Sequence, residues 1–74
     1  MDLVDPATIR RRAGAIYGNE RAPKTLRAQA GFMVAQAFFQ QQRSDEACRW
    51  TDSALRLTPA NETYLRFKRD QRCT

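Results

Sequence analysis

The pattern of apolar and polar residues changes most sharply between Ala28 and Gln42, where the chain reads AQAGFMVAQAFFQQQ without a charged side chain. Charged residues make up 28% of the whole chain, so this run stands apart from its surroundings. Most of its residue types favour helix. A helix that is apolar nearly all round must be covered on several sides. The run therefore predicts the central helix of a small all-α domain, too short for a bilayer, which needs about 20 residues.

The segment before this run predicts an N-terminal helix over residues 5–18. Asp5 suits a helix N-cap, and Pro6 suits the first helical position because its missing N–H would be unpaired there. Gly18 and Asn19 tolerate left-handed backbone and end the helix. One apolar stripe follows the helical period: Ile9, Ala13, Ile16 and Tyr17.

A helical hairpin is predicted over residues 25–59. Thr25 is the expected cap of the central helix, and Ser44 is the expected cap of the next helix. Asp45 and Glu46 would then favour the first turn through the helix dipole. Pro59 ends the second helix, because the residue before a proline avoids helical backbone. The apolar stripe of this helix is Ala47, Trp50, Ala54 and Leu57.

A fourth helix is predicted over residues 60–72, starting near Ala60 or Asn61. Its apolar residues are Tyr64, Leu65 and Phe67, and it is polar from Lys68 onward. No segment shows the period-two alternation of a strand. The sequence therefore predicts an all-α bundle of about four helices in a single domain, 1–74.

Composition limits the stability and the chemistry of this domain. A chain of 74 residues buries roughly 60% of its unfolded surface, so its stability is expected to be marginal. The net charge is +5, which favours acidic or phosphate-bearing partners. There is no histidine base, no glycine-rich phosphate loop and no recognisable cofactor motif. We expect a protein that is not an enzyme and has no cofactor.

The two cysteines, Cys48 and Cys73, are 25 positions apart in a chain without histidine. This arrangement excludes the usual zinc-binding spacings. Two separate thiols suit a reducing cytoplasm, and a single disulfide is the less favoured alternative.

The N-terminal residues MDLVDPAT lack the apolar segment of a secretory signal, so a cytoplasmic location is expected.

The stretch from Ala28 to Pro59 resembles a single tetratricopeptide repeat, a helix–turn–helix unit of about 34 residues. Small residues stand at the matching positions Ala35, Ala47 and Ala54, with an aromatic at Phe38 and a closing proline. In the family, these small side chains let two antiparallel helices approach closely. The departures from the pattern are Gly31 for a large residue, Gln42 for the turn glycine, and Ser44 and Thr51 for aromatics.

The resemblance implies a groove lined by the first helix of the repeat. Several repeats are usually needed for independent stability, so a lone repeat with flanking helices suggests a protein partner or a homodimer. Small bacterial adaptors and secretion-type chaperones have this character, and a viral inhibitor is a related option. The alternative for the phenylalanines is core packing under the N-terminal helix. The implied groove positions are Gln29, Phe32, Gln36, Phe39 and Gln40.

A second candidate site is basic. Its residues could contact phosphates or an acidic partner, and the alternative is an ordinary solvated basic face. Nucleic-acid binding through the helix that carries the three consecutive arginines is the alternative function. The candidate residues are Arg10, Arg11, Arg12, Lys24 and Arg27.

Overall fold

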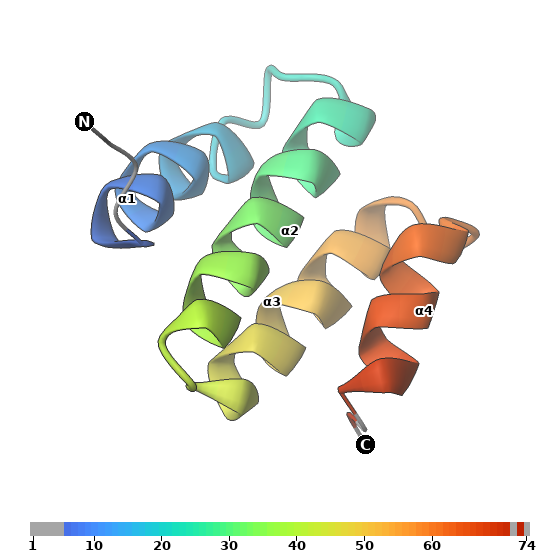
Figure 1. The fold of residues 1–74 in the computed structure, drawn as a ribbon. Coiled ribbons are helices and arrows are strands. Elements are labelled where there is room, and N and C mark those ends of the chain that lie inside the picture. Colours follow the sequence, from blue (N-terminus) through green and yellow to red (C-terminus); the bar gives the residue numbers. More distant parts are fainter. Residues whose placement is uncertain (1–5, 72, 74) are drawn as a thin grey trace.

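The computed structural model describes residues 6–71 and residue 73, and in this part of the chain every regular element is an α-helix. Four helices follow one another: α1 (Pro6–Tyr17), α2 (Lys24–Gln40), α3 (Ser44–Leu57) and α4 (Glu62–Asp70). Each packs against the next in a flattened assembly of 34 × 31 × 17 Å (Figure 1). The predicted all-α bundle of four helices is confirmed.

The ends of the predicted segments fall partly outside the described residues. The predicted cap Asp5 lies outside them, as does the predicted helix end at residue 72.

Within the described residues, none of the helices combines the length and the apolar character needed to cross a membrane.

Small side chains bring α2 and α3 close together. Ala35, Ala47 and Ala54 are all fully buried, as the sequence predicted. The resulting hairpin separates two apolar clusters. The first, between α1 and the hairpin, contains Ala13, Ala30 and Val34 with Tyr17, Phe38 and Trp50 packed against them. The second, between the hairpin and α4, contains Ala28, Ala54 and Tyr64 with Phe32, Leu55 and Leu57.

The outer helices bury less apolar surface than their patterns predicted. Ile16 on α1 and Leu65 on α4 are 40% and 45% exposed, although Ile16 was assigned to an apolar stripe and Leu65 was counted among the apolar residues of its helix. The reason is that α1 and α4 stand at the two ends of the helix row, where only one side of each is covered. A local pattern shows which residues are apolar, and the neighbouring helices decide which of them are buried.

Thr51 belongs to the core, which its polar side chain did not suggest. It is fully buried, and its hydroxyl donates a 2.8 Å hydrogen bond to the carbonyl oxygen of Ala47 one turn earlier. A buried hydroxyl is costly only when it lacks a partner. The backbone of α3 supplies this partner, so a threonine fits this core position.

Two of the predicted helix caps are wrong. Pro23 precedes α2 and Arg43 precedes α3, and within the described residues neither helix start has a side-chain cap. Thr25 and Ser44 lie inside the helices instead. Arg43 forms an ion pair with Glu46 at 2.6 Å. The expected start of the fourth helix is confirmed by a cap.

That cap is a hydrogen bond from the backbone N–H of Tyr64 to Oδ1 of Asn61, at 3.1 Å. An amide side chain that accepts from the third residue of a helix satisfies one of the unpaired N–H groups there. It fixes the first turn of α4.

The turn between α2 and α3 places Gln42 in left-handed backbone, with φ of 61°. The backbone N–H groups of Gln42 and Arg43 donate to the carbonyls of Phe39 and Phe38, which closes the end of α2. Among the described residues no glycine has positive φ, so Gly18 does not end α1 in the way the sequence suggested. The strained position is occupied by glutamine.

Replacing Gln42 with glycine is expected to raise the free energy of unfolding by about 1 kcal/mol, because glycine has no Cβ to oppose positive φ. Urea denaturation measures the change. The matched control is Gln41→Gly, where φ is −91° and glycine should be destabilising. Equal effects of the two substitutions would contradict the assignment of strain to Gln42.

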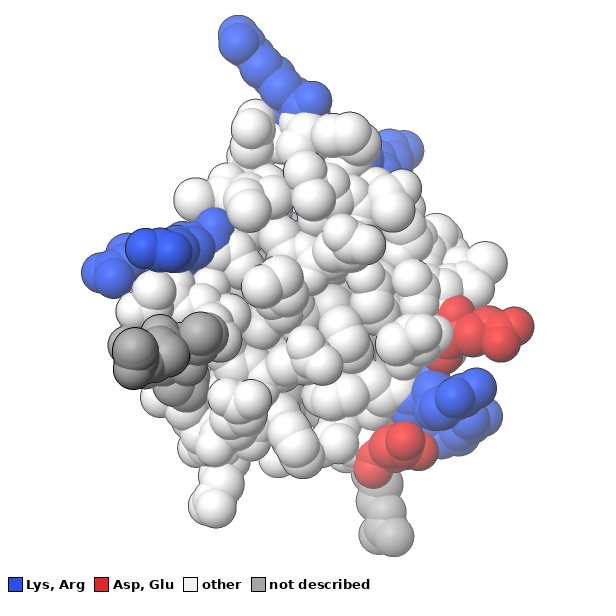
Figure 2. Space-filling view, turned by 45° about the horizontal axis from the view of Figure 1, so that its top comes forward, with Lys and Arg blue, Asp and Glu red and all other residues white. Residues whose placement is uncertain are grey.

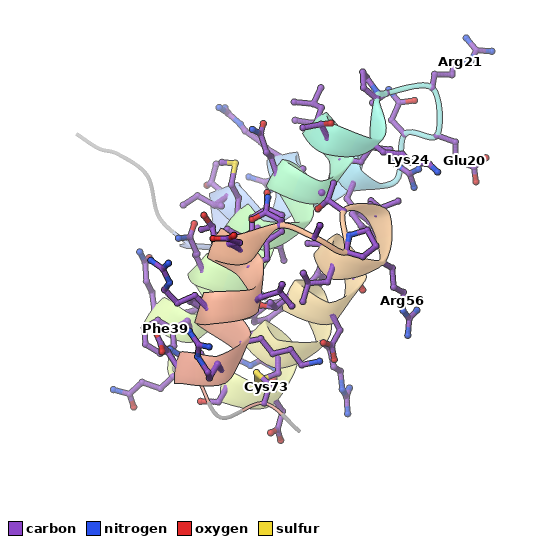
Figure 3. The ribbon with its side chains drawn as sticks, turned by 90° about the vertical axis from the view of Figure 1, so that its right-hand side faces the viewer. Glu20, Arg21, Lys24, Phe39, Arg56 and Cys73 are labelled. Carbon is purple, nitrogen blue, oxygen red and sulfur yellow. A yellow bond between two sulfur atoms is a disulfide. The ribbon has the colours of Figure 1, made fainter. Side chains whose placement is uncertain are left out.

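The cysteines are joined, so the expectation of two free thiols is wrong for this structure. Cys48 near the start of α3 forms a disulfide with Cys73, just beyond α4, and their Cα atoms are 5.6 Å apart. Figure 3 shows Cys73 at the far end of α4. The spacing of the two cysteines along the chain does not show that α4 folds back on α3 and brings Cys73 next to Cys48.

Candidate protein-docking face

A shallow groove of about 370 Å³ follows α2 between α1 and α4. Among the described residues that line it, none is charged. Gln36 and Gln40 supply its polar groups. The apolar lining comes from three helices: Ile9, Met33, Ala37, Phe39 and Phe67.

A smaller groove of about 240 Å³ lies beside it, between α2 and α4. Gln36 and Phe67 line both grooves, so the Phe67 side chain forms a wall that the two share. The other residues of the smaller groove are Phe32, Thr63, Arg66 and Asp70. We call the adjoining surface of the two grooves the aromatic face and define it by six of their lining residues: Phe32, Met33, Gln36, Phe39, Gln40 and Phe67.

Phe67 holds the aromatic face together through edge-on ring contacts. Its ring centroid lies 5.0 Å from that of Phe32 at an interplanar angle of 83°, and 5.8 Å from that of Phe39 at 79°. Phe32 also packs on the buried Tyr64, with tilted rings whose centroids are 4.4 Å apart. The two T-shaped pairs that Phe67 forms are favourable because the positive edge of one ring meets the negative face of the other. Burial raises the pKa of the Tyr64 phenol.

These contacts separate the roles of the two phenylalanines that the sequence left open. Phe32 is half-buried between two rings of α4 and contributes to packing. Phe39 touches Phe67 at one edge and remains 44% exposed. The packing partner of Phe32 is α4, and the idea that both rings pack under the N-terminal helix is wrong.

The structure brings four of the five predicted groove positions into the two grooves. Gln29 is exposed on α2 but lies outside the lining of both. The sequence interpretation missed Met33, which is 48% exposed, as well as Ile9 and Phe67. Met33 could have been found, since it lies one helical turn from both Gln29 and Gln36. Ile9 and Phe67 come from other helices and had no local signal.

The larger groove has no charged lining residue, whereas Arg66 and Asp70 line the smaller groove. Figure 2 shows a broad uncharged area with lysine, arginine, aspartate and glutamate side chains at its margin. The lining of the larger groove agrees with this distribution. An apolar centre within a polar rim is the usual organisation of a protein interface.

The predicted basic site is divided by the structure. The guanidinium of Arg10 lies 4.7 Å from the ring centroid of Phe38, and within the described part of the chain its buried Nε has no hydrogen-bond partner. Arg27 donates from Nε to the carbonyl oxygen of Tyr17 at 2.9 Å. Both arginines therefore serve helix packing. Arg11, Arg12 and Lys24 are exposed.

The resemblance of the α2–α3 hairpin to a tetratricopeptide repeat stays a prediction. No protein-family model, no curated protein and no solved structure matches this chain.

Proposed function

We propose that this chain is a non-enzymatic interaction module, built like a single tetratricopeptide repeat with flanking helices, that binds a partner protein on the aromatic face. The observation that carries the proposal is the exposure of Phe39 and Met33, at 44% and 48%, beside an uncharged groove. Large apolar side chains gathered in a polar surround mark interaction sites. Small adaptors, chaperones and inhibitors work in this way.

The shape of the face favours a helical segment with one apolar side. Phe32 and Phe39 are seven residues apart on α2, so they lie two turns apart along one line. Apolar side chains at helical spacing in a partner would reach both grooves. Gln36 and Gln40 can donate and accept hydrogen bonds, which satisfies polar groups of the partner at the rim.

The charge distribution favours acidic flanks on that segment. Arg11 and Arg12 are exposed on α1, which forms one side of the larger groove, and Arg66 lines the smaller groove together with Asp70. The net charge of +5 steers acidic partners toward the protein. A second copy would bring two positive charges of this size together. We therefore assign the face to an acidic amphipathic segment of another protein.

The test uses two synthetic amphipathic helices with the same leucine stripe, one carrying glutamates and one carrying lysines on its polar side. Fluorescence anisotropy should show binding of the acidic peptide by the wild-type protein. Phe39→Ala should weaken it about tenfold, which corresponds to about 1.4 kcal/mol, because the proposal makes Phe39 a hot-spot residue and truncation of such a residue costs more than 1 kcal/mol. Leu65→Ala is the matched control, since Leu65 is equally exposed at 45% but outside both grooves. Equal losses for both variants would contradict the proposal.

Light scattering coupled to size exclusion, at low and high salt, separates this proposal from self-association. A monomer is expected at both salt concentrations. A salt-stable dimer that Phe39→Ala dissociates would assign the aromatic face to a second copy instead.

Nucleic-acid binding has a weaker structural basis, because Arg10 and Arg27 are engaged in packing. It would require binding to duplex or single strands that falls steeply with salt. The cytoplasmic location stays a prediction. The disulfide argues against a compartment that is permanently reducing.

A further inference from the structure

The aromatic face depends on the last turn of α4. Phe67 is the residue of that turn that contacts both Phe32 and Phe39, and it lines both grooves. If this turn leaves α2, the two grooves lose their common wall. What holds the turn in place therefore controls the face.

The two ends of α4 are held differently. Its first turn is fixed by the Asn61 cap and by the buried Tyr64. Beyond Phe67, Lys68 pairs with Asp52 at 2.8 Å, but both side chains are more than a third exposed. Ion pairs exposed to this extent contribute little. The strong tie at this end is the bond between Cys48 and Cys73.

A helix as short as α4, with nine residues, is not stable in water without such support. The backbone N–H of Cys73 donates to the carbonyl oxygen of Lys68, so the disulfide also fixes the end of the helix. Figure 3 shows Phe39 and Cys73 toward the same end of α4. The disulfide and the aromatic face thus share one structural element.

The disulfide is open to attack from solvent. Both cysteines are partly exposed, and they line a polar hollow of about 280 Å³. Thiol–disulfide exchange requires that a thiolate reach one of the sulfur atoms. The remaining lining residues are Ser44, Asp45, Arg49, Asp52 and Gln71.

We propose that the Cys48–Cys73 disulfide is a redox clamp that keeps the aromatic face assembled for its partner. This inference rests on the proposed function and names the regulation of the same site. A thiolate of a dithiol reductant attacks one sulfur and forms a mixed disulfide, and its second thiol then displaces the protein sulfur. The dithiol loses two electrons and two protons as it becomes a disulfide, and Cys48 and Cys73 become thiols.

Reduction then lets the last turn of α4 fray and removes Phe67 from Phe32 and Phe39. A partner binds the oxidised form more tightly, because its groove is already formed. If the turn is formed in about a tenth of the reduced molecules, the apparent affinity falls about tenfold. By linkage, a bound partner protects the disulfide from reduction by the same factor.

The first experiment tests the clamp without a partner, by NMR on the full chain before and after addition of dithiothreitol. The nuclear Overhauser contacts between Phe67 and Phe32 should be lost on reduction. The Tyr17–Trp50 contact is the internal control, because these rings are 5.1 Å apart in the other apolar cluster and should stay together. Persistence of both contacts, or simultaneous loss of both, would overturn the clamp.

The second experiment measures the acidic peptide against the oxidised and reduced protein. Binding should be about tenfold weaker after reduction. Phe67→Ala, which retains the disulfide, should bind as weakly as the reduced protein and should lose the redox difference. Leu65→Ala on the same helix should retain it. Equal binding to both redox forms would overturn the clamp alone, whereas no binding to either form would overturn the proposed function with it.

Discussion

Replacing Cys48 with serine is expected to lower the free energy of unfolding by about 3 kcal/mol and the melting temperature by about 15 °C. The bond joins residues 25 positions apart, so it restricts the unfolded chain substantially. For a domain of this size the loss is a large share of the total stability. Urea denaturation followed by circular dichroism measures it.

The reduced wild-type protein is the control for this substitution. It should unfold at the same urea concentration as Cys48→Ser, and dithiothreitol should have no effect on the variant. A variant as stable as the oxidised wild-type protein would show that the disulfide adds nothing to the fold.

Replacing Gly31 with leucine is expected to lower the free energy of unfolding by about 3 kcal/mol, through overpacking. A Cβ atom at this position would lie 3.1 Å from Cδ1 of Tyr17 and 3.8 Å from Cβ of Ala54. Helices α1 and α3 therefore both approach α2 at this glycine, and the ring of Tyr17 occupies the space that a large side chain would need. The quantity to measure is again the urea midpoint.

Gly14→Leu is the matched control for this prediction, because a Cβ atom added there meets nothing within 4 Å. Leucine favours helix over glycine, so this variant should be as stable as the wild-type protein or more stable. If both substitutions destabilised the protein equally, the cause would be the leucine itself and not the close approach at Gly31.

The resemblance to a tetratricopeptide repeat stays a prediction, and three of the four positions that depart from its pattern can be described in local physical terms. Gly31 gives room to Tyr17, and Thr51 satisfies its hydroxyl within α3. Gln42 takes left-handed backbone where the family has glycine. The first two fit their positions at little cost, and the third is the one that we expect to reduce stability.

The sequence alone determined the helices and the tight hairpin. Helical periodicity and breaking residues act within a few positions, so they are visible in one chain. The small residues Ala35, Ala47 and Ala54 are buried as predicted, because small side chains have the same consequence wherever two helices meet. The caps expected at Thr25 and Ser44 were wrong, because residue identity is only part of what makes a cap. A cap depends on the backbone angles entering the helix, which residue identity alone does not fix.

Only the tertiary structure decided the aromatic face and its disulfide. Phe32 and Phe39 are both phenylalanines of α2 and both contact Phe67 edge-on, yet Phe32 is half-buried and Phe39 is exposed. The difference is that Phe32 also packs on the buried Tyr64 of α4. Cys48 and Cys73 meet because α4 folds back along α3. Contacts between distant helices depend on how the helices cross, and no local pattern in the chain records that crossing.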